Sequence, residues 1–157
     1  RCYADSICFE ISDFESCFEK ITVTPTSYLV IVTRGHKYDQ LVLSRAVLTT
    51  ASFVGLIGSR AKIARIFRRL RQDGVSQERL SQVKAPIGLD IGARAPEEIA
   101  ISIVAQLISH RRRAYLKRND PSRLAEPEPA VSAFEPSIDT TDLERIETEE
   151  ETGNVTT

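Results

Sequence analysis

The chain has 157 residues, of which 41% are hydrophobic, and its formal net charge is −1. This length is enough for one domain with a core of useful size, and no run of about 18 apolar residues predicts a membrane span. Cys2, Cys8 and Cys17 lack C-x-x-C spacing, which argues against a disulfide framework and against a zinc site. We therefore expect a cytoplasmic protein with reduced thiols.

The near-neutral charge hides a strong segregation along the chain. After Leu124 the sequence carries ten acidic residues against a single base, Arg145, and four of the seven prolines also lie at Pro121 or beyond. This composition predicts a folded body over residues 1–113 and an acidic, disordered tail over residues 114–157. The tail is either a solubilising appendage or an electrostatic shield over the basic body.

The first half of the sequence predicts a strand, helix, strand unit. Residues 6–11 are typical of a strand, and residues 13–21 of a short helix that begins at an aspartate. The apolar runs at 28–32 and 53–58 do not alternate with polar residues, so they indicate strands covered on both faces, as in a parallel sheet. Residues 36–50 between them have helical spacing, which completes a βαβ unit with a right-handed crossover.

The second half predicts mainly helices. In residues 59–74 apolar side chains recur at helical spacing, and we expect them to pack on the sheet: Ile63, Ile66, Phe67 and Leu70. A small helix opens at Ser76, and a turn-rich segment then leads to a helix over residues 96–113. This last helix is apolar on most sides, so we expect it to be buried. The alternation as a whole predicts an α/β fold with a mostly parallel, three-layer sheet.

The basic residues of the 59–74 helix raise the question of nucleic-acid binding. They could meet phosphates, but the only aromatic residue, Phe67, lies on the packing face, so the helix offers no stacking platform. We therefore do not expect nucleic acid as a partner.

A strand-to-helix turn at Gly58 is the first candidate site. Glycine permits a tight turn and a close approach to a ligand, and the free N–H groups of the following helix favour an anion. Ser59 adds a hydroxyl, and Arg60 and Lys62 add positive charge. The motif is neither G-x-G-x-x-G nor a Walker loop, so a plain turn with a serine cap and solvated bases is an equal alternative.

The second candidate follows the preceding strand. Thr33, His36 and Asp39 crowd its carboxyl end, where ligands bind in open α/β sheets. His36 could titrate near neutrality, and Asp39 could orient it or cap the helix. The alternative is that His36 is a polar loop residue and Asp39 a cap.

The third candidate is the loop around Asp90. Gly88 and Gly92 flank this carboxylate and allow the backbone to approach a ligand or another loop. Asp90 could bind a hydroxyl or act as a base. A structural turn in which Asp90 accepts from backbone N–H groups is an equal alternative.

The segments “VTRGHKYD”, “FVGLIGSRAKIARIFRRLRQDGVS” and “APIGLDIGARAPEEIAISIVAQLI” resemble, in order and spacing, the C-terminal Rossmann-like domain of the XdhC/CoxI family. The resemblance covers residue 28 to about residue 113. The first segment is similar to the branch associated with selenium-dependent molybdenum hydroxylases, since the other common form has a second histidine in place of Arg34.

The resemblance implies an accessory protein rather than an enzyme. Such a protein binds the molybdenum cofactor (molybdopterin), protects it during sulfuration and delivers it to an apo molybdenum hydroxylase of the xanthine dehydrogenase type. A sulfurase and a molybdenum cofactor nucleotidyl-transferase are implied as further partners. The cofactor phosphate would lie against residues 58–62, and other candidates would line the wall and mouth of the site: Thr33, His36, Asp39, Gly88, Asp90 and Gly92. We expect the double change Arg60→Ala and Lys62→Ala to weaken binding without affecting folding, because exposed charges contribute little to stability.

The sequence also departs from the family pattern. The strand, glycine turn and second strand that usually open this domain are not found before Arg1, and Gln106 replaces a common glutamate. We therefore expect the downstream part of a Rossmann-like domain whose open sheet edge pairs with a separate N-terminal fragment or a second copy. The alternatives are an NAD(P)-binding oxidoreductase-like domain, disfavoured by the missing glycine fingerprint, and a fragment of a split or mis-called gene.

Overall fold

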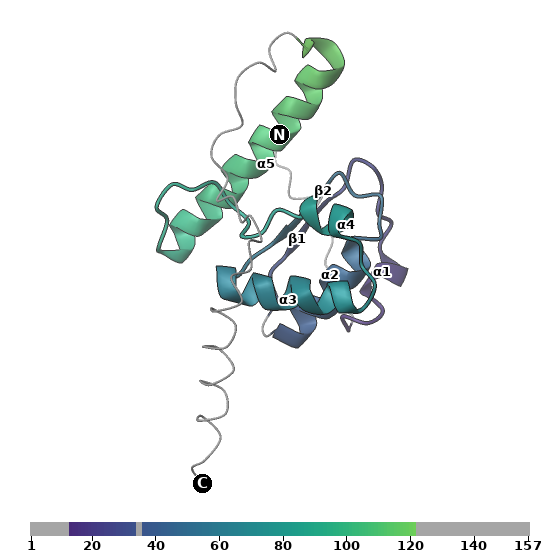
Figure 1. Ribbon diagram of the computed structural model, residues 1–157. Helices are drawn as coiled ribbons and strands as arrows, with labels where there is room; N and C mark the ends of the chain where they lie inside the picture. The colour runs from purple at the N-terminus through teal and green to yellow at the C-terminus, as the bar shows by residue number, and fades with distance from the viewer. Residues whose placement is uncertain (1–12, 34–35, 122–157) are drawn as a thin grey trace.

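The computed structural model of the chain describes residues 13–33 and 36–121 (Figure 1). The order of elements along the chain is α1 (Cys17–Lys20), β1 (Tyr28–Ile31), α2 (His36–Ala46), β2 (Phe53–Leu56), α3 (Arg60–Gln72), α4 (Gln77–Ser81) and α5 (Pro96–Asn119). Helices alternate with parallel strands, which confirms the α/β prediction. The strand predicted at 6–11 and residues 122–157 of the predicted tail lie outside the described residues.

The sheet is parallel, as the βαβ pattern predicted. β1 pairs with β2 in the register Tyr28↔Phe53 to Ile31↔Leu56. On its other side β2 meets the chain at Lys84, whose N–H donates to the Val54 carbonyl at 2.9 Å. The far edge of β1 pairs with no strand among the described residues, and an apolar groove of about 320 Å³ runs beside it.

The core lies between the sheet and the helices α2 and α3. The predicted face of α3 is buried at all four positions, which confirms the i, i+3, i+4, i+7 pattern. Leu43 of α2, Leu56 of β2 and Leu80 of α4 are fully buried in the same cluster. Each such side chain contributes about 1.5–3 kcal/mol through its removal from water, so this cluster fixes the position of the turn between β2 and α3.

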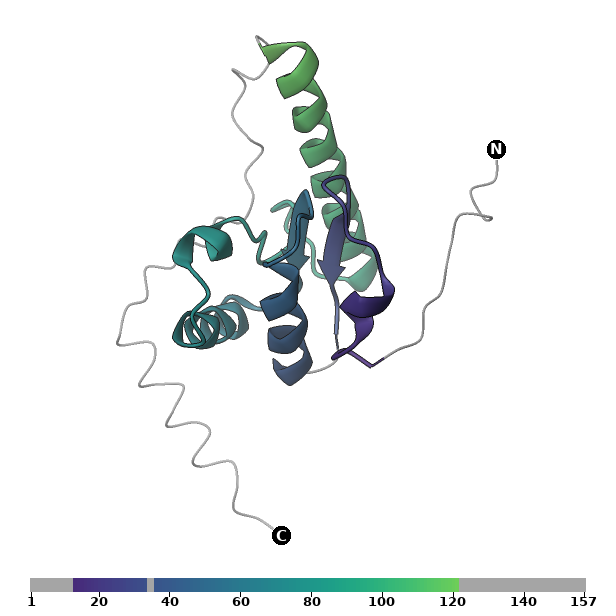
Figure 2. The same ribbon diagram turned by 90° about the vertical axis from the view of Figure 1, so that its right-hand side faces the viewer.

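The helix α5 covers the opposite face of the sheet (Figure 2). His110 makes edge contacts with Tyr28 and Phe53, at ring-centroid distances of 5.5 and 5.2 Å. The helix runs six residues past Arg113, to Asn119, so the helical body extends into the segment that was predicted as tail. None of the helices in the described ranges has the length and apolarity that a membrane span requires.

The prediction that α5 is buried is wrong. Four large apolar side chains of this helix are more than half exposed: Ile101, Val104, Ile108 and Tyr115. A helix that is apolar on most sides needs cover on more than one side, and the described part of the chain covers only the side that faces the sheet. The outer side of α5 is therefore an apolar surface.

Candidate functional site

Three backbone segments meet at the carboxyl edge of the sheet. Thr33 follows β1 and Gly58 follows β2, and the two strand ends stay in register, since the Ile57 N–H donates to the Ile31 carbonyl at 3.1 Å. The loop at 86–93 joins the same edge because the Ile87 N–H donates to the Leu56 carbonyl at 3.0 Å. The edge is the position at which open α/β sheets bind their ligands.

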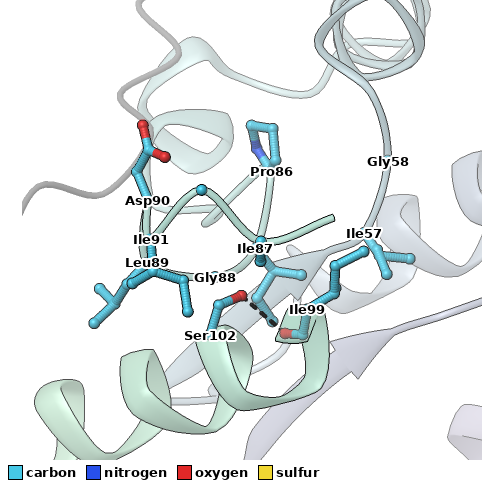
Figure 3. A pocket seen from close by; sticks show the side chains of 12 residues that line it. Ile57, Gly58, Pro86, Ile87, Gly88, Leu89, Asp90, Ile91, Ile99 and Ser102 are labelled. Carbon is cyan, nitrogen blue, oxygen red and sulfur yellow. Dashed lines mark hydrogen bonds between the residues drawn. The ribbon is translucent and has the colours of Figure 1, made fainter. Parts of the chain in front are cut away.

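A cavity of about 360 Å³ lies between the Gly58 turn and this loop (Figure 3). The helix α5 contributes Ile99 and Ser102 to its lining, and the Ser102 hydroxyl donates to the Ile99 carbonyl at 2.8 Å. The loop and the turn supply the other lining residues: Ile57, Gly58, Pro86, Ile87, Gly88, Leu89, Asp90, Ile91, Gly92 and Ala93. Four of the predicted site residues therefore line one cavity, namely Gly58, Gly88, Asp90 and Gly92.

Gly88 is the most constrained residue of the loop. Its φ is +114°, and a Cβ added there would lie 2.4 Å from the Ser102 hydroxyl oxygen. Its buried N–H donates to the Gln106 side-chain carbonyl at 2.8 Å, and the next N–H, of Leu89, donates to the Ser102 carbonyl at 3.2 Å. These contacts hold the loop against α5, and only glycine satisfies both the backbone angle and the close approach.

Sequence reasoning missed the structural role of Ser102 and Gln106. Both are buried, and they are four residues apart on one face of an otherwise apolar helix, which is the signal that could have found them. The Gln106 Nε2 has no hydrogen-bond partner among the described residues. The position read from the sequence as a departure from the family is therefore the residue that holds the loop in place.

The start of α3 is organised by Ser59. This residue is the N-cap, and its hydroxyl accepts a hydrogen bond from the Lys62 N–H at 3.3 Å. The serine-cap interpretation is confirmed as local structure, because the Ser59 side chain satisfies one of the helix N–H groups that have no partner within the helix. Arg60 is exposed at the first helical position, where an anion would meet both its charge and the helix dipole.

Lys62, which the sequence predicts to add positive charge at the Gly58 turn, is paired with a buried carboxylate. Its ammonium forms an ion pair with Asp39, which is 0% exposed, while the Lys62 side chain is 16% exposed. The Thr33 hydroxyl donates to the other oxygen of Asp39 at 2.6 Å. Asp39 therefore forms no part of an open wall, and the three side chains instead connect the end of β1 to the first turn of α3.

The remaining predicted residues lie at the opening or outside the description. Asp90 is exposed, and its carboxylate points away from Ser102 (Figure 3). Gly92 is also exposed, with a φ of +72°. His36 begins α2, but its side chain, like residues 34–35, lies outside the description, so its role stays a prediction. No cluster of three or more potential metal ligands occurs within 13–33 and 36–121.

Comparison with known proteins shows the relationships of the chain. Residues 4–107 match the XdhC Rossmann domain. The chain is 32% identical over 101 residues to the uncharacterized protein YqeB of Escherichia coli strain K12, covering 64% of this chain and 18% of that protein. It is 29% identical over 99 residues to a probable xanthine dehydrogenase subunit of Bacillus subtilis strain 168, covering 63% and 28%.

A solved structure gives the same relationship in three dimensions. The crystal structure of a xanthine dehydrogenase from Bacillus halodurans superposes with a TM-score of 0.58 at 33% identity, covering 74% of this chain and 34% of that one. The chain thus spans less than a third of the length of the two curated relatives. The family match covers well over half of its residues, and the chain belongs to the XdhC family, with residues 4–107 forming its Rossmann domain.

Proposed function

We propose that the chain binds the molybdenum cofactor at the cavity of the sheet edge and serves in the maturation of a molybdenum hydroxylase of the xanthine dehydrogenase type. Two relatives carry xanthine dehydrogenase in their names, which supports the choice of client. The observation that carries the proposal is the cavity itself, where the Gly58 turn, the glycine-bounded loop and the helix α5 face one space.

The shape and chemistry of the cavity fit a single ring system with an anionic end. Its volume of about 360 Å³ is at the small end of small-molecule sites, and its walls are mainly aliphatic, which suits a flat heterocycle such as a pterin. Gly58 lines the cavity and lies two residues before α3, so in this proposal the phosphate of molybdopterin extends past Gly58 toward the first N–H groups of α3 and Arg60. Asp90 at the opening supplies a carboxylate that accepts hydrogen bonds from N–H groups of the pterin.

The other candidates act indirectly in this proposal. Lys62 and Asp39 hold the end of β1 against α3, and Gly88 with Gln106 holds the loop against α5. When bound, the cofactor would supply the molybdenum for sulfuration and transfer, and the chain would supply binding, orientation and exclusion of water. No residue of the chain is assigned a catalytic role.

A dinucleotide is the second candidate, favoured by the position of the cavity at the carboxyl edge of a parallel sheet. The turn after β2 has one glycine where the dinucleotide fingerprint has three, and the cavity has room for one heterocycle rather than two. We therefore rank NAD(P) below molybdopterin and include it in the test.

The test is to incubate the purified chain with molybdopterin, NAD⁺ or NADPH and to measure the retained ligand by fluorescence and mass spectrometry. Arg60→Ala should lower pterin retention about tenfold or more, because a charge-assisted contact to phosphate is lost. Arg69→Ala, on an exposed residue in the last turn of the same helix, is the matched control and should bind normally. Retention that is equal in both variants, or retention of NAD(P) alone, would overturn the proposal.

A second arm addresses the client. Addition of the cofactor-loaded chain to an apo xanthine dehydrogenase should restore its activity faster than free cofactor does, and the Arg60→Ala variant should lose this advantage. If the loaded chain gives no advantage over free cofactor, the maturation role is wrong even where binding holds.

A further inference from the structure

The outer face of α5 carries an apolar stripe that the proposed cofactor site does not use. Ile101, Val104, Ile108 and Tyr115 are spaced by three, four and seven residues, so they lie on one side of the helix. Their exposed fractions are 63%, 53%, 52% and 51%. The outer side of a helix packed on a sheet is ordinarily polar, so a stripe of this kind indicates a contact surface.

Charged residues lie at equal distances on either side of the aliphatic part of the stripe, residues 101–108. Glu97, in the first turn of α5, precedes Ile101 by four residues, and Arg112 follows Ile108 by four residues. Both are exposed, and the helical period places both on the side of the stripe. The face thus has an acid at one end, a base at the other and aliphatic side chains between them.

We propose that this face binds the same face of a second copy of the chain, with the two α5 helices antiparallel and a two-fold axis between Val104 and Ala105. In this register Ile101 lies opposite Ile108 of the second copy, and Glu97 lies opposite Arg112. Tyr115 then lies beyond the first residue of the second copy's α5, and its ring keeps its contact with the Arg112 guanidinium of its own copy, 5.4 Å from the ring centroid.

The charges select this occupant and this orientation. A face whose two ends have opposite signs complements itself only when the helices run antiparallel, because a parallel pair would place like charges opposite each other. The residues that line the cavity or hold its loop, Ser102 and Gln106, lie on the other side of α5. The pairing therefore leaves the cavity open. Its test does not depend on whether the proposed function is correct.

Sedimentation equilibrium across the micromolar range tests the pairing. The unmodified chain should form a dimer, and Val104→Asp should weaken it at least tenfold, since a carboxylate replaces an apolar side chain beside the axis. Leu48→Asp is the matched control, because Leu48 is as exposed as the stripe but belongs to no part of α5. Circular dichroism confirms that the variants are folded.

Charge reversal tests the register. Glu97→Arg and Arg112→Glu should each weaken the dimer about fivefold, because each places like charges opposite each other twice per dimer. The double variant restores the pairs with exchanged signs and should dimerise like the unmodified chain. A double variant that is weaker than either single variant would refute this register.

Cysteine cross-linking tests the axis directly, in a background in which Cys2, Cys8 and Cys17 are serine. Val104→Cys should give a disulfide-linked dimer on oxidation. Glu97→Cys should not, because its two symmetry-related positions lie fifteen residues, or about 22 Å, apart along the helices. A chain that stays monomeric at every concentration overturns the proposal, as does a dimer that Val104→Asp leaves intact, which would place the contact elsewhere, such as the open edge of β1.

Discussion

The ion pair between Lys62 and Asp39 should make Lys62 a stability residue rather than a surface cation. Lys62→Met removes the charge and keeps the aliphatic stem, which leaves the fully buried Asp39 carboxylate with a hydrogen bond from the Thr33 hydroxyl but without its counter-charge. Removal of one member of a buried pair costs about 3–5 kcal/mol, a large share of the 5–15 kcal/mol that stabilises a typical domain. We expect a loss of about 3 kcal/mol, because Lys62 keeps some access to water.

The two members of the pair should not be equivalent. Asp39→Leu leaves Lys62 behind, whose flexible stem can carry the ammonium to solvent, so this variant should lose less stability than Lys62→Met. The double variant buries no unpaired charge and should recover most of the loss, with a coupling free energy of about 2 kcal/mol or more. Arg71→Met, on an exposed base of the same helix, should stay within about 0.5 kcal/mol of the unmodified chain.

Urea unfolding followed by circular dichroism measures all four variants. A loss below about 1 kcal/mol for Lys62→Met, or additive effects in the double variant, would refute the assignment of a buried, coupled pair. The stability of Lys62→Met also bears on the double change Arg60→Ala and Lys62→Ala. That double change was expected to leave folding intact because both bases were taken to be exposed, and a destabilised Lys62→Met would show that this expectation is wrong for Lys62. With Lys62 paired, only Arg60→Ala separates binding from folding.

Three further predictions concern the loop and helix α5. Gly88→Ala should destabilise the chain by about 2 kcal/mol or more in urea unfolding, because the new Cβ meets Ser102 at 2.4 Å, whereas Gly92→Ala meets nothing within 4 Å and should cost about 1 kcal/mol from its positive φ alone; equal losses would contradict the close packing. Gln106→Ala leaves a buried N–H without its acceptor and should cost about 1–3 kcal/mol, with faster hydrogen exchange in the loop, and unchanged exchange would exclude this role. The backbone N–H groups of Arg94 and Ala95 hold the pKa of Glu98 below its ordinary value of 4.5. The contribution of Glu98 to the free energy of unfolding is therefore present above pH 4.5 and is lost as the pH falls through the lowered pKa. Glu98→Gln should remove this part of the pH dependence of unfolding, and an unaltered pH dependence would refute the assignment.

Local patterns predicted most of the fold. The period of the apolar residues identified the buried face of α3, and Ser59 and Ser76 capped helices where their chemistry predicted. The contact between Lys62 and Asp39 could not be predicted in the same way, because it depends on how closely α2 approaches α3 after the core has packed. Periodicity also gives no information about cover: an apolar helix face has the same pattern whether it is buried or exposed.

The candidate site was predicted as three segments at one edge, and the structure supports that placement at the level of the backbone. What the sequence lacked was the distinction between residues that face the cavity and residues that hold the segments together. Gly88 and Asp90 are two residues apart, yet one is fixed against α5 and the other lies at the opening. That distinction rests on contacts across eighteen residues of chain, such as the bond from Gly88 to Gln106.

The edge of β1 that no strand of the described residues covers determines which extended segment can pair with this sheet. In natural sheets, lysine, proline or a bulge at an edge strand prevents pairing with another chain. The four residues of β1, Tyr-Leu-Val-Ile, contain neither lysine nor proline. The apolar groove beside β1 is lined by Phe14, Phe18 and Ile21 and can receive the side chains of an added strand. A strand added there would also have one of its ends beside Thr33, at the carboxyl edge of the sheet. Its residues would then extend the candidate site on the side opposite the Gly58 turn and the 86–93 loop.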